Sequence, residues 1–144
     1  MVASSPAAFA PPRRPDLHRE DSTAILPYMK KRLLVAEDEQ DLQVIYRLML
    51  GEDYEVIEAQ NGREAVEMWK QFHPDLVLMD IQMPVMSGDA AIREILGVDP
   101  LAKILAVTAY RYTPEQLGVP VLSKGFGPTE FITAVESVLH GRAA

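Results

Sequence analysis

The chain has 144 residues, of which 48% are hydrophobic, and this composition supports one domain with a buried core plus a tail. It contains no cysteine, which excludes disulfides and zinc-thiolate sites, and no run approaches the roughly 18 apolar residues of a membrane span. The chain has 14 Lys and Arg and 21 Asp and Glu, and the resulting net charge of -7 disfavours nucleic-acid binding. From the missing cysteines and the missing membrane span we expect a soluble, cytoplasmic protein.

Residues 1–28 have the composition of a disordered tail. They hold five of the eleven prolines and show no periodic apolar face. They also lack the continuous apolar segment of a signal peptide, so export is not indicated. We therefore expect a tail over residues 1–28 and one domain over residues 29–144, which begins at Met29.

Strand and helix patterns alternate from Lys31 onward. A short apolar strand at 32–36 is followed by a helix that stops at Gly51, and a second strand covers 54–59. The next helix opens after Asn61-Gly62 and closes at His73-Pro74. Apolar residues at helical spacing identify the two helices: Leu42, Ile45, Leu48 and Met49 in the first, and Ala65, Val66 and Trp69 in the second.

The second half of the chain continues the alternation. Apolar residues at 76–79 predict a buried strand that ends on Asp80, and a helix follows from about Asp89 to Leu96. Strands are expected at 103–108 and 119–124, with about one helical turn between them at 113–117, and a last helix runs from Pro128 to Gly141. Five strands interleaved with helices predict a parallel α/β sheet whose right-handed crossovers place helices on both faces.

One edge of the predicted sheet collects the chemically active side chains. The carboxyl ends of parallel strands share an edge, and the residues there are Glu37, Asp38, Asp80, Thr108 and Lys124. Clustered carboxylates suit Mg²⁺, which prefers carboxylate, water and phosphate oxygens. A lysine and a threonine hydroxyl add a positive charge and a hydrogen-bond donor. Such a set of groups can bind and transfer a phosphoryl group.

Four segments near these strand ends resemble those of a known family. "LLVAEDE", "LVLMDIQMPVMSG", "AVTA" and "LSKGF" occur in this order, and residues 32–140 thereby resemble the receiver domain of two-component response regulators. The resemblance implies a flavodoxin-like, doubly wound fold with five parallel strands. It also implies a signalling switch, rather than a metabolic enzyme. Such a switch accepts a phosphoryl group from a histidine kinase or a histidine phosphotransfer protein and loses it slowly by self-catalysed hydrolysis.

The same resemblance implies a role for each residue at the edge. Asp80 is the phosphoacceptor, and Thr108 and Lys124 hold the phosphoryl oxygens. Each residue also has an ordinary structural explanation, because a strand-end Asp often caps a turn, Thr is common in strands and Lys is common on surfaces. The implied Mg²⁺ ligands are Glu37 in an outer-shell position, Asp38, Asp80 and the backbone carbonyl of Gln82.

The chain departs from the family pattern at three places. Gly125 follows the lysine where the family has proline, so we expect a trans peptide with a backbone angle specific to glycine, and a less rigidly aimed Lys124. Val121 stands where the family has its switch aromatic residue. The segment between Thr108 and Lys124 is shorter than usual, so the fourth helix should be short or missing. Binding partners that use the fourth-helix face in other receivers are therefore not assumed for this chain. Whether the chain forms a homodimer stays an open question.

These departures keep a second function open, a degenerate receiver that acts only as a protein-interaction module without phosphorylation. A phosphohydrolase with an aspartyl phosphate is disfavoured, because such enzymes need an acid where Gln82 stands. No output domain follows the last helix, so the chain resembles a stand-alone receiver with an unknown downstream target, although a fragment of a hybrid kinase has the same pattern. Tyr110, two residues after Thr108, is expected to shield the phosphoryl group from water.

Overall fold

The computed structural model describes residues 30–141, which form a sheet of five parallel strands. The order of the strands across the sheet is β2-β1-β3-β4-β5, which confirms the predicted doubly wound architecture. The predicted tail over residues 1–28 and the predicted domain start at Met29 lie outside the described residues. The strands are β1 (Lys31–Ala36), β2 (Tyr54–Ala59), β3 (Leu76–Asp80), β4 (Ile104–Thr108) and β5 (Val121–Ser123).

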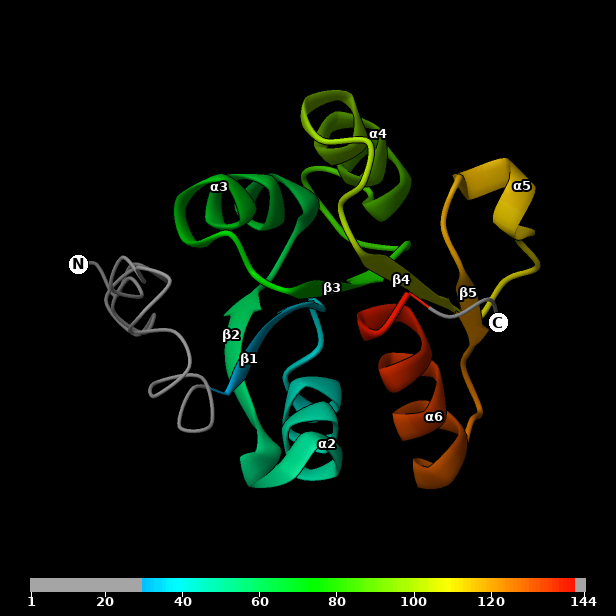
Figure 1. Cartoon of the computed structure of the whole chain (residues 1–144). Helices are drawn as coiled ribbons and strands as arrows, with labels where there is room; N and C mark the ends of the chain where they lie inside the picture. Colours follow the sequence, from blue (N-terminus) through cyan, green and yellow to red (C-terminus); the bar gives the residue numbers. More distant parts are fainter. Residues whose placement is uncertain (1–29, 142–144) are drawn as a thin grey trace, which may run out of the picture.

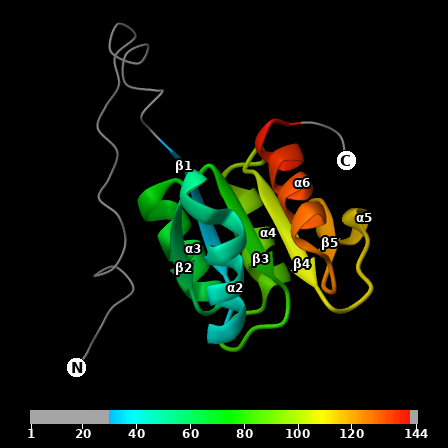
Figure 2. The same ribbon diagram turned by 90° about the horizontal axis from the view of Figure 1, so that it is seen from below.

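Helices cover both faces of this sheet, as Figure 1 shows. One face carries α3 (Gly62–Phe72), α4 (Gly88–Val98) and the short α5 (Pro114–Leu117). The other face carries α2 (Gln40–Leu50) and α6 (Pro128–Leu139), which lie in front of the sheet in Figure 2. A 3₁₀ turn, η3 (Gly51–Asp53), joins α2 to β2. Across residues 30–141, every helix is too short or too polar to cross a lipid bilayer.

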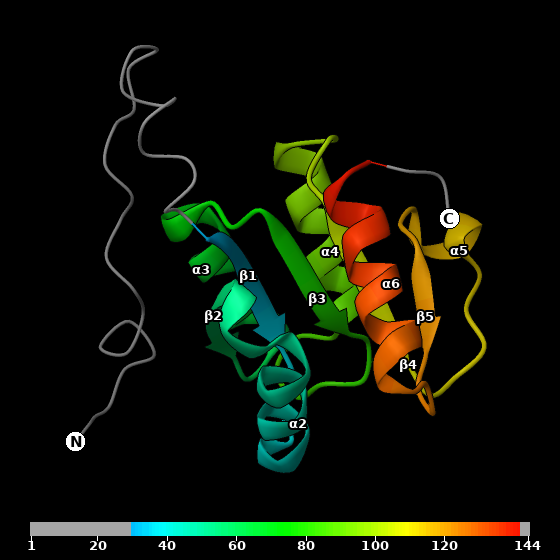
Figure 3. The same ribbon diagram turned by 60° about the horizontal axis from the view of Figure 1, so that its bottom comes forward.

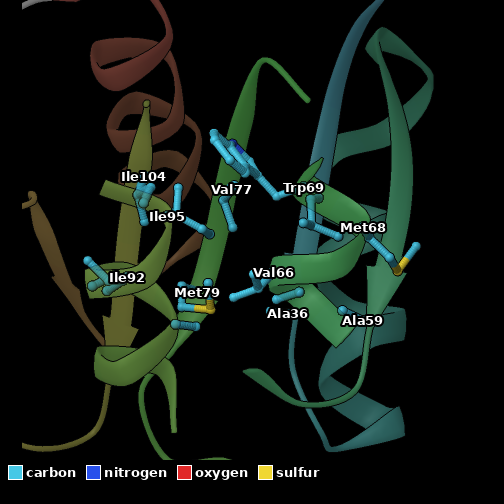
Figure 4. Packing of buried hydrophobic residues seen from close by; sticks show 14 of the residues in the cluster. Ala36, Ala59, Val66, Met68, Trp69, Val77, Met79, Ile92, Ile95 and Ile104 are labelled. Atoms are coloured by element: carbon cyan, nitrogen blue, oxygen red, sulfur yellow. The ribbon is translucent and has the colours of Figure 1, made fainter. Parts of the chain in front are cut away.

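The sheet supplies side chains to an apolar core on each of its faces. Successive strand residues point to opposite faces, so Leu34 of β1 packs with the α3 and α4 side chains, while Leu33 packs with those of α2 and α6. All five residues of β3 are buried, as its continuous apolar run predicts. Figure 4 shows the core under α3 and α4, which includes Val66, Trp69, Val77, Met79, Ile92 and Ile95.

Of the four apolar residues that identify α2 in the sequence, Leu42 and Met49 pack partly buried against the core, but Ile45 and Leu48 are exposed. We call Leu42, Ile45, Leu48 and Met49 the α2 stripe. A stripe at helical spacing normally faces the core, but Leu48 is 74% exposed, Ile45 is 46% exposed, and the helix buries Gln43, Tyr46 and Leu50 instead. The α2 stripe lines a groove of about 490 Å³, here called the α2–α6 groove, together with Tyr46, Lys124, Gly125, Phe126 and Pro128.

The segment between β4 and β5 contains the short helix that the sequence predicts. α5 has four residues and begins with a capping box, in which the Thr113 hydroxyl accepts from the Gln116 backbone N–H at 3.1 Å. The Gln116 side chain accepts from the Thr113 backbone N–H at 2.8 Å in return. Gly118, with φ of +78°, ends the turn. The expectation of a short fourth helix is therefore confirmed.

Candidate functional site

The carboxyl ends of the central strands meet at one edge of the sheet. Figure 3 shows β1 and β3 running side by side in the same direction. In the strand register, Ala36 lies opposite Met79 and Asp80 lies opposite Val107. The last residues of β1, β3 and β4 therefore lie within two residues of one another along the sheet edge. Side chains from the ends of these strands reach a common site, as the sequence predicts.

Three carboxylates come together at this edge. Glu37, Asp38 and Asp80 each offer an oxygen atom, and these atoms lie within 4.8 Å of one another. Glu37 is 1% exposed and Asp80 is 4% exposed, whereas Asp38 is exposed. Two buried carboxylates and one accessible carboxylate in such a small space fit the oxygen ligands that Mg²⁺ takes in proteins. The geometry is therefore compatible with the predicted cation site.

Lys124 follows the edge strand β5 and reaches this cluster across the end of β4. Its Nζ atom lies 3.3 Å from Asp80 Oδ1 and 3.5 Å from Glu37 Oε1. Its backbone N–H donates to the Thr108 carbonyl at 2.8 Å. The following peptide is trans and Gly125 has φ of +101°, as expected for a glycine in place of proline. The ammonium group faces both buried carboxylates, and a less rigid aim of Lys124 stays a prediction.

Two other predicted residues lie at the same edge. Thr108 is fully buried, and its Oγ1 atom accepts a hydrogen bond from the Tyr110 backbone N–H at 3.0 Å. The Thr108 hydroxyl hydrogen is then free to point elsewhere. The Gln82 backbone N–H donates to the Asp80 carboxylate. The structure thus places Gln82 beside Asp80. The role of the Gln82 backbone carbonyl as a metal ligand stays a prediction.

The expected shielding by Tyr110 is wrong for this structure. The Tyr110 side chain is 61% exposed. A ring that stands mostly in solvent does not exclude water from a buried carboxylate such as Asp80. The backbone hydrogen bond to Thr108 holds only the main chain of this residue.

Burial and like charges make two carboxylates of this site, those of Glu37 and Asp80, unusually basic. Burial, followed by the neighbouring Asp80 charge, raises the pKa of Glu37 to about 7. Burial also raises the pKa of Asp80, against the opposing effect of the Lys124 charge. Burial alone would lower the pKa of Lys124, but the Asp80 and Glu37 charges outweigh it and raise that pKa. Such a cluster gains from a bound cation, which neutralises the carboxylates.

Two glycines shape the loop that follows Asp80. A side chain at Gly88 would place a Cβ atom 1.9 Å from the Asp80 carbonyl oxygen, and the Gly88 N–H donates to Ile81 O at 2.8 Å. Gly62 at the start of α3 donates to Met86 O at 2.9 Å, and a Cβ there would lie 2.4 Å from that oxygen. The loop is therefore packed against both strand and helix, which explains the glycine that ends "LVLMDIQMPVMSG".

Sequence reasoning missed Gln43, which is 4% exposed. Its Nε2 atom donates to the carbonyls of Val35, Glu37 and Ala59 at 3.1, 2.9 and 3.1 Å. These carbonyls lie at or just beyond the carboxyl ends of β1 and β2, so Gln43 fastens the backbone that carries Glu37. The available signal was the spacing of Gln43, Tyr46 and Leu50, which also repeats at helical intervals.

Comparison with known proteins points to one family. Residues 33–136 match the model of the response regulator receiver domain. The chemotaxis protein CheY of Thermotoga maritima is 46% identical over 83 residues, which cover 56% of this chain and 69% of that protein. Protein CcdB of Bacillus subtilis is 38% identical over 116 residues, which cover 75% of this chain and 97% of that protein.

Solved structures of similar chains have the same fold. A LuxR-family two-component response regulator from Aurantimonas superposes with a TM-score of 0.73 at 28% identity, over 81% of this chain and 89% of that one. The response regulator TrrA of Thermotoga maritima, in complex with Mg²⁺ and BeF, superposes with a TM-score of 0.70 at 33% identity. The TrrA match covers 75% of this chain and 98% of that one.

Proposed function

The chain belongs to the response regulator receiver domain family, and from this we propose that it is a phosphoaspartate switch in a two-component phosphorelay. The phosphoryl donor would be a phosphohistidine on a histidine kinase or a histidine phosphotransfer protein. The reaction would take place in the cytoplasm. The proposed domain covers residues 29–144. The chain would catalyse its own phosphorylation and its own slow dephosphorylation, and the phosphorylated form would bind a downstream protein.

The single observation that carries this proposal is the environment of Asp80. Its carboxylate is buried at the middle of the sheet edge, with the Lys124 ammonium at 3.3 Å and two further carboxylates beside it. A structural carboxylate would be satisfied by the lysine alone, and the extra acids would only repel it. Their presence is explained if the site holds a cation and a phosphoryl group.

The chemistry then follows from the positions of the side chains. An Asp80 carboxylate oxygen attacks the phosphorus of the donor, the phosphorus–nitrogen bond breaks, and the imidazole leaves with the electron pair. Lys124 is placed to bind a phosphoryl oxygen, and the Thr108 hydroxyl is proposed to donate to another. Asp38, Asp80 and the Gln82 carbonyl would hold Mg²⁺, with Glu37 in the outer shell. The ion would supply positive charge for the transferred group.

The α2–α6 groove is proposed as the place where the donor protein docks. Lys124 lines this groove and also contacts Asp80, so the groove adjoins the site that a donor histidine must reach. The α2 stripe gives it an exposed apolar wall, which is unusual for a helix of a soluble domain. An amphipathic helix of the donor fits a groove of this kind.

A receiver without phosphorylation, acting only as an interaction module, is the alternative. The loss of the usual proline and of the switch aromatic residue motivates it. The position of Lys124 supports the phosphoacceptor function instead, because its ammonium reaches Asp80 although Gly125 replaces the proline. A module that no longer accepts phosphate would have no need for this contact.

Incubation with acetyl phosphate, with and without Mg²⁺, tests the proposal. We expect a Mg²⁺-dependent acylphosphate that is stable in acid and labile in base, detected by intact mass and absent in Asp80→Ala. Asp53→Ala, which removes an exposed carboxylate from the η3 turn, is the matched control and should be modified normally. If the wild type gains no phosphoryl group and does not respond to fluoroberyllate with Mg²⁺, the interaction module is the better description.

A further inference from the structure

Three buried side-chain atoms beside the site have no hydrogen-bond partner within the part of the chain that the structure describes. They are Glu37 Oε1, Gln43 Oε1 and Tyr46 Oη. All three residues are at least 96% buried. Buried polar atoms are almost always paired with protein or with ordered water. Gln43 contacts the Glu37 backbone carbonyl, and the Glu37 and Asp80 charges act on the Tyr46 hydroxyl, so the three residues border the same site and can share a partner.

The orientation of Gln43 is determined by its other atoms. Its Nε2 atom faces three backbone carbonyls, and exchanging the amide nitrogen and oxygen would set oxygen against oxygen at all three. The Gln43 Oε1 atom must therefore point away from the strand ends. Gln43 and Tyr46 are three residues apart on α2, so their side chains lie on the same face of the helix.

The orientation of Tyr46 is determined by its ring. The ring stacks on Phe131 at 5.5 Å and on Phe126 at 6.3 Å between centroids, with interplanar angles of 19° in both pairs. Burial, and then the negative charges of Glu37 and Asp80, raise the pKa of the Tyr46 hydroxyl. The hydroxyl therefore stays protonated, as a hydrogen-bond donor that lies close to the acids of the site.

The three unpaired atoms are chemically complementary. The Tyr46 hydroxyl can donate, Gln43 Oε1 can only accept, and Glu37 Oε1 accepts when the carboxylate is ionised. A single water molecule can accept from the tyrosine and donate to both oxygens, and three hydrogen bonds are typical of a buried water. We propose that such a water joins these atoms, and that Tyr46 is a positioning residue that holds Glu37 at the phosphorylation site.

This role matters because Glu37 has few other restraints. Its Oε2 atom accepts from the Glu39 backbone N–H at 3.2 Å, and its Oε1 atom has the Lys124 ammonium at 3.5 Å. If Lys124 turns to a phosphoryl group, as the proposed function requires, Oε1 loses that neighbour. The water would then keep Glu37 in place. The inference deepens the proposed function and rests on it only for this last step.

Tyr46→Phe tests the inference, because it removes the hydroxyl and keeps the stacked ring. Tyr54→Phe is the matched control, because Tyr54 of β2 packs against the same core cluster as Tyr46. We expect Mg²⁺ to bind Tyr46→Phe about tenfold more weakly by calorimetry, as is typical when a residue behind the metal ligands is lost. We also expect a lower Tm without metal, and a water between the three atoms in a crystal structure of the wild type.

The opposite results would overturn the inference. If the hydroxyl is unpaired, phenylalanine removes a buried polar group and the Tm rises, with Mg²⁺ affinity unchanged. A crystal structure without density between the three atoms would have the same meaning. If the wild type binds no Mg²⁺, the proposed metal site fails, while the Tm change and the crystal structure still decide whether Tyr46 is bridged to Glu37.

Discussion

Helices α2 and α3 each have 11 residues, yet they bury different kinds of side chain. α3 begins with an Asn61 cap that accepts from the Glu64 N–H at 2.9 Å, and it buries an apolar face that includes Val66 and Trp69. α2 has no side-chain cap, buries Gln43 and Tyr46, and turns its apolar stripe to the α2–α6 groove.

This difference follows from what lies beneath each helix. α3 packs on β1 and β2, where apolar side chains meet it, so the usual hydrophobic rule holds. α2 begins two residues after the acid pair and passes beside the carboxyl ends of β1 and β2, where backbone carbonyls need donors. A helix beside a functional site can thus bury polar side chains that position the site. Some of its apolar side chains then stay exposed and are available to a partner protein.

Replacing one large side chain on each helix should show the contrast most strongly. Trp69 is 7% exposed, and Trp69→Ala should lower the free energy of unfolding by about 3–5 kcal/mol, because a buried ring is lost. Leu48 is 74% exposed, and Leu48→Ala should change the free energy of unfolding by less than about 0.5 kcal/mol. Urea unfolding followed by circular dichroism measures both. A loss above this value at Leu48 would mean that the α2 stripe supports the fold.

The acids before α2 should make stability depend on metal and pH, whereas α3 has no such cluster before it. The pKa of Glu37 rises from 4.5 in the unfolded chain to about 7 in the fold. Between these values the folded chain holds a proton that the unfolded chain has released. Without metal, the free energy of unfolding should therefore fall as pH rises through this window.

Mg²⁺ should remove this penalty. At a concentration about 100 times Kd, it should add about 2.7 kcal/mol to the free energy of unfolding, and more of this effect should appear above pH 7. Thermal unfolding across pH values measures it. Asp38→Ala should abolish the stabilisation and Asp53→Ala should keep it. An unchanged Mg²⁺ response in Asp38→Ala would exclude Asp38 from the metal ligands.

The polar contacts of α2 should contribute measurably to stability. Gln43→Leu keeps the volume of the side chain but leaves three buried carbonyls without their shared donor. We expect it to lower the free energy of unfolding by about 1–3 kcal/mol. Gln71→Leu, at an exposed position of α3, should be close to neutral in the same urea titration. Equal effects at the two positions would show that Gln43 does not fasten the strand ends.

The exposed side of α2 should matter for the donor protein rather than for the fold. Leu48→Asp should slow phosphotransfer from a phosphorylated histidine phosphotransfer protein about tenfold, or about 1.4 kcal/mol, because a charge enters the apolar groove. Phosphorylation by acetyl phosphate should stay unchanged. Gln71→Asp adds the same charge to α3 and should affect neither reaction. Equal slowing with both donors would place the effect of Leu48→Asp in the site itself.

The sequence alone determined the strands and the edge at which the site lies. A continuous apolar run ending on Asp80 has few structural solutions, and in a parallel sheet the residue after such a run must lie at the carboxyl edge. The approach of Lys124 to Asp80 follows from the same rule. The single turn of α5 and the glycine-specific angle at Gly125 were predictable too, because chain length and local sterics set them.

Only the tertiary structure decided which face of α2 is buried and what Tyr110 does. α2 carries two sets of residues at helical spacing, the α2 stripe and the set of Gln43, Tyr46 and Leu50, and periodicity alone does not choose between them. The choice depends on carbonyls of two different strands, which become neighbours only when β1 and β2 pair and which accept from the Gln43 amide. Burial is a property of the surroundings, and for α2 those surroundings form only when the sheet does.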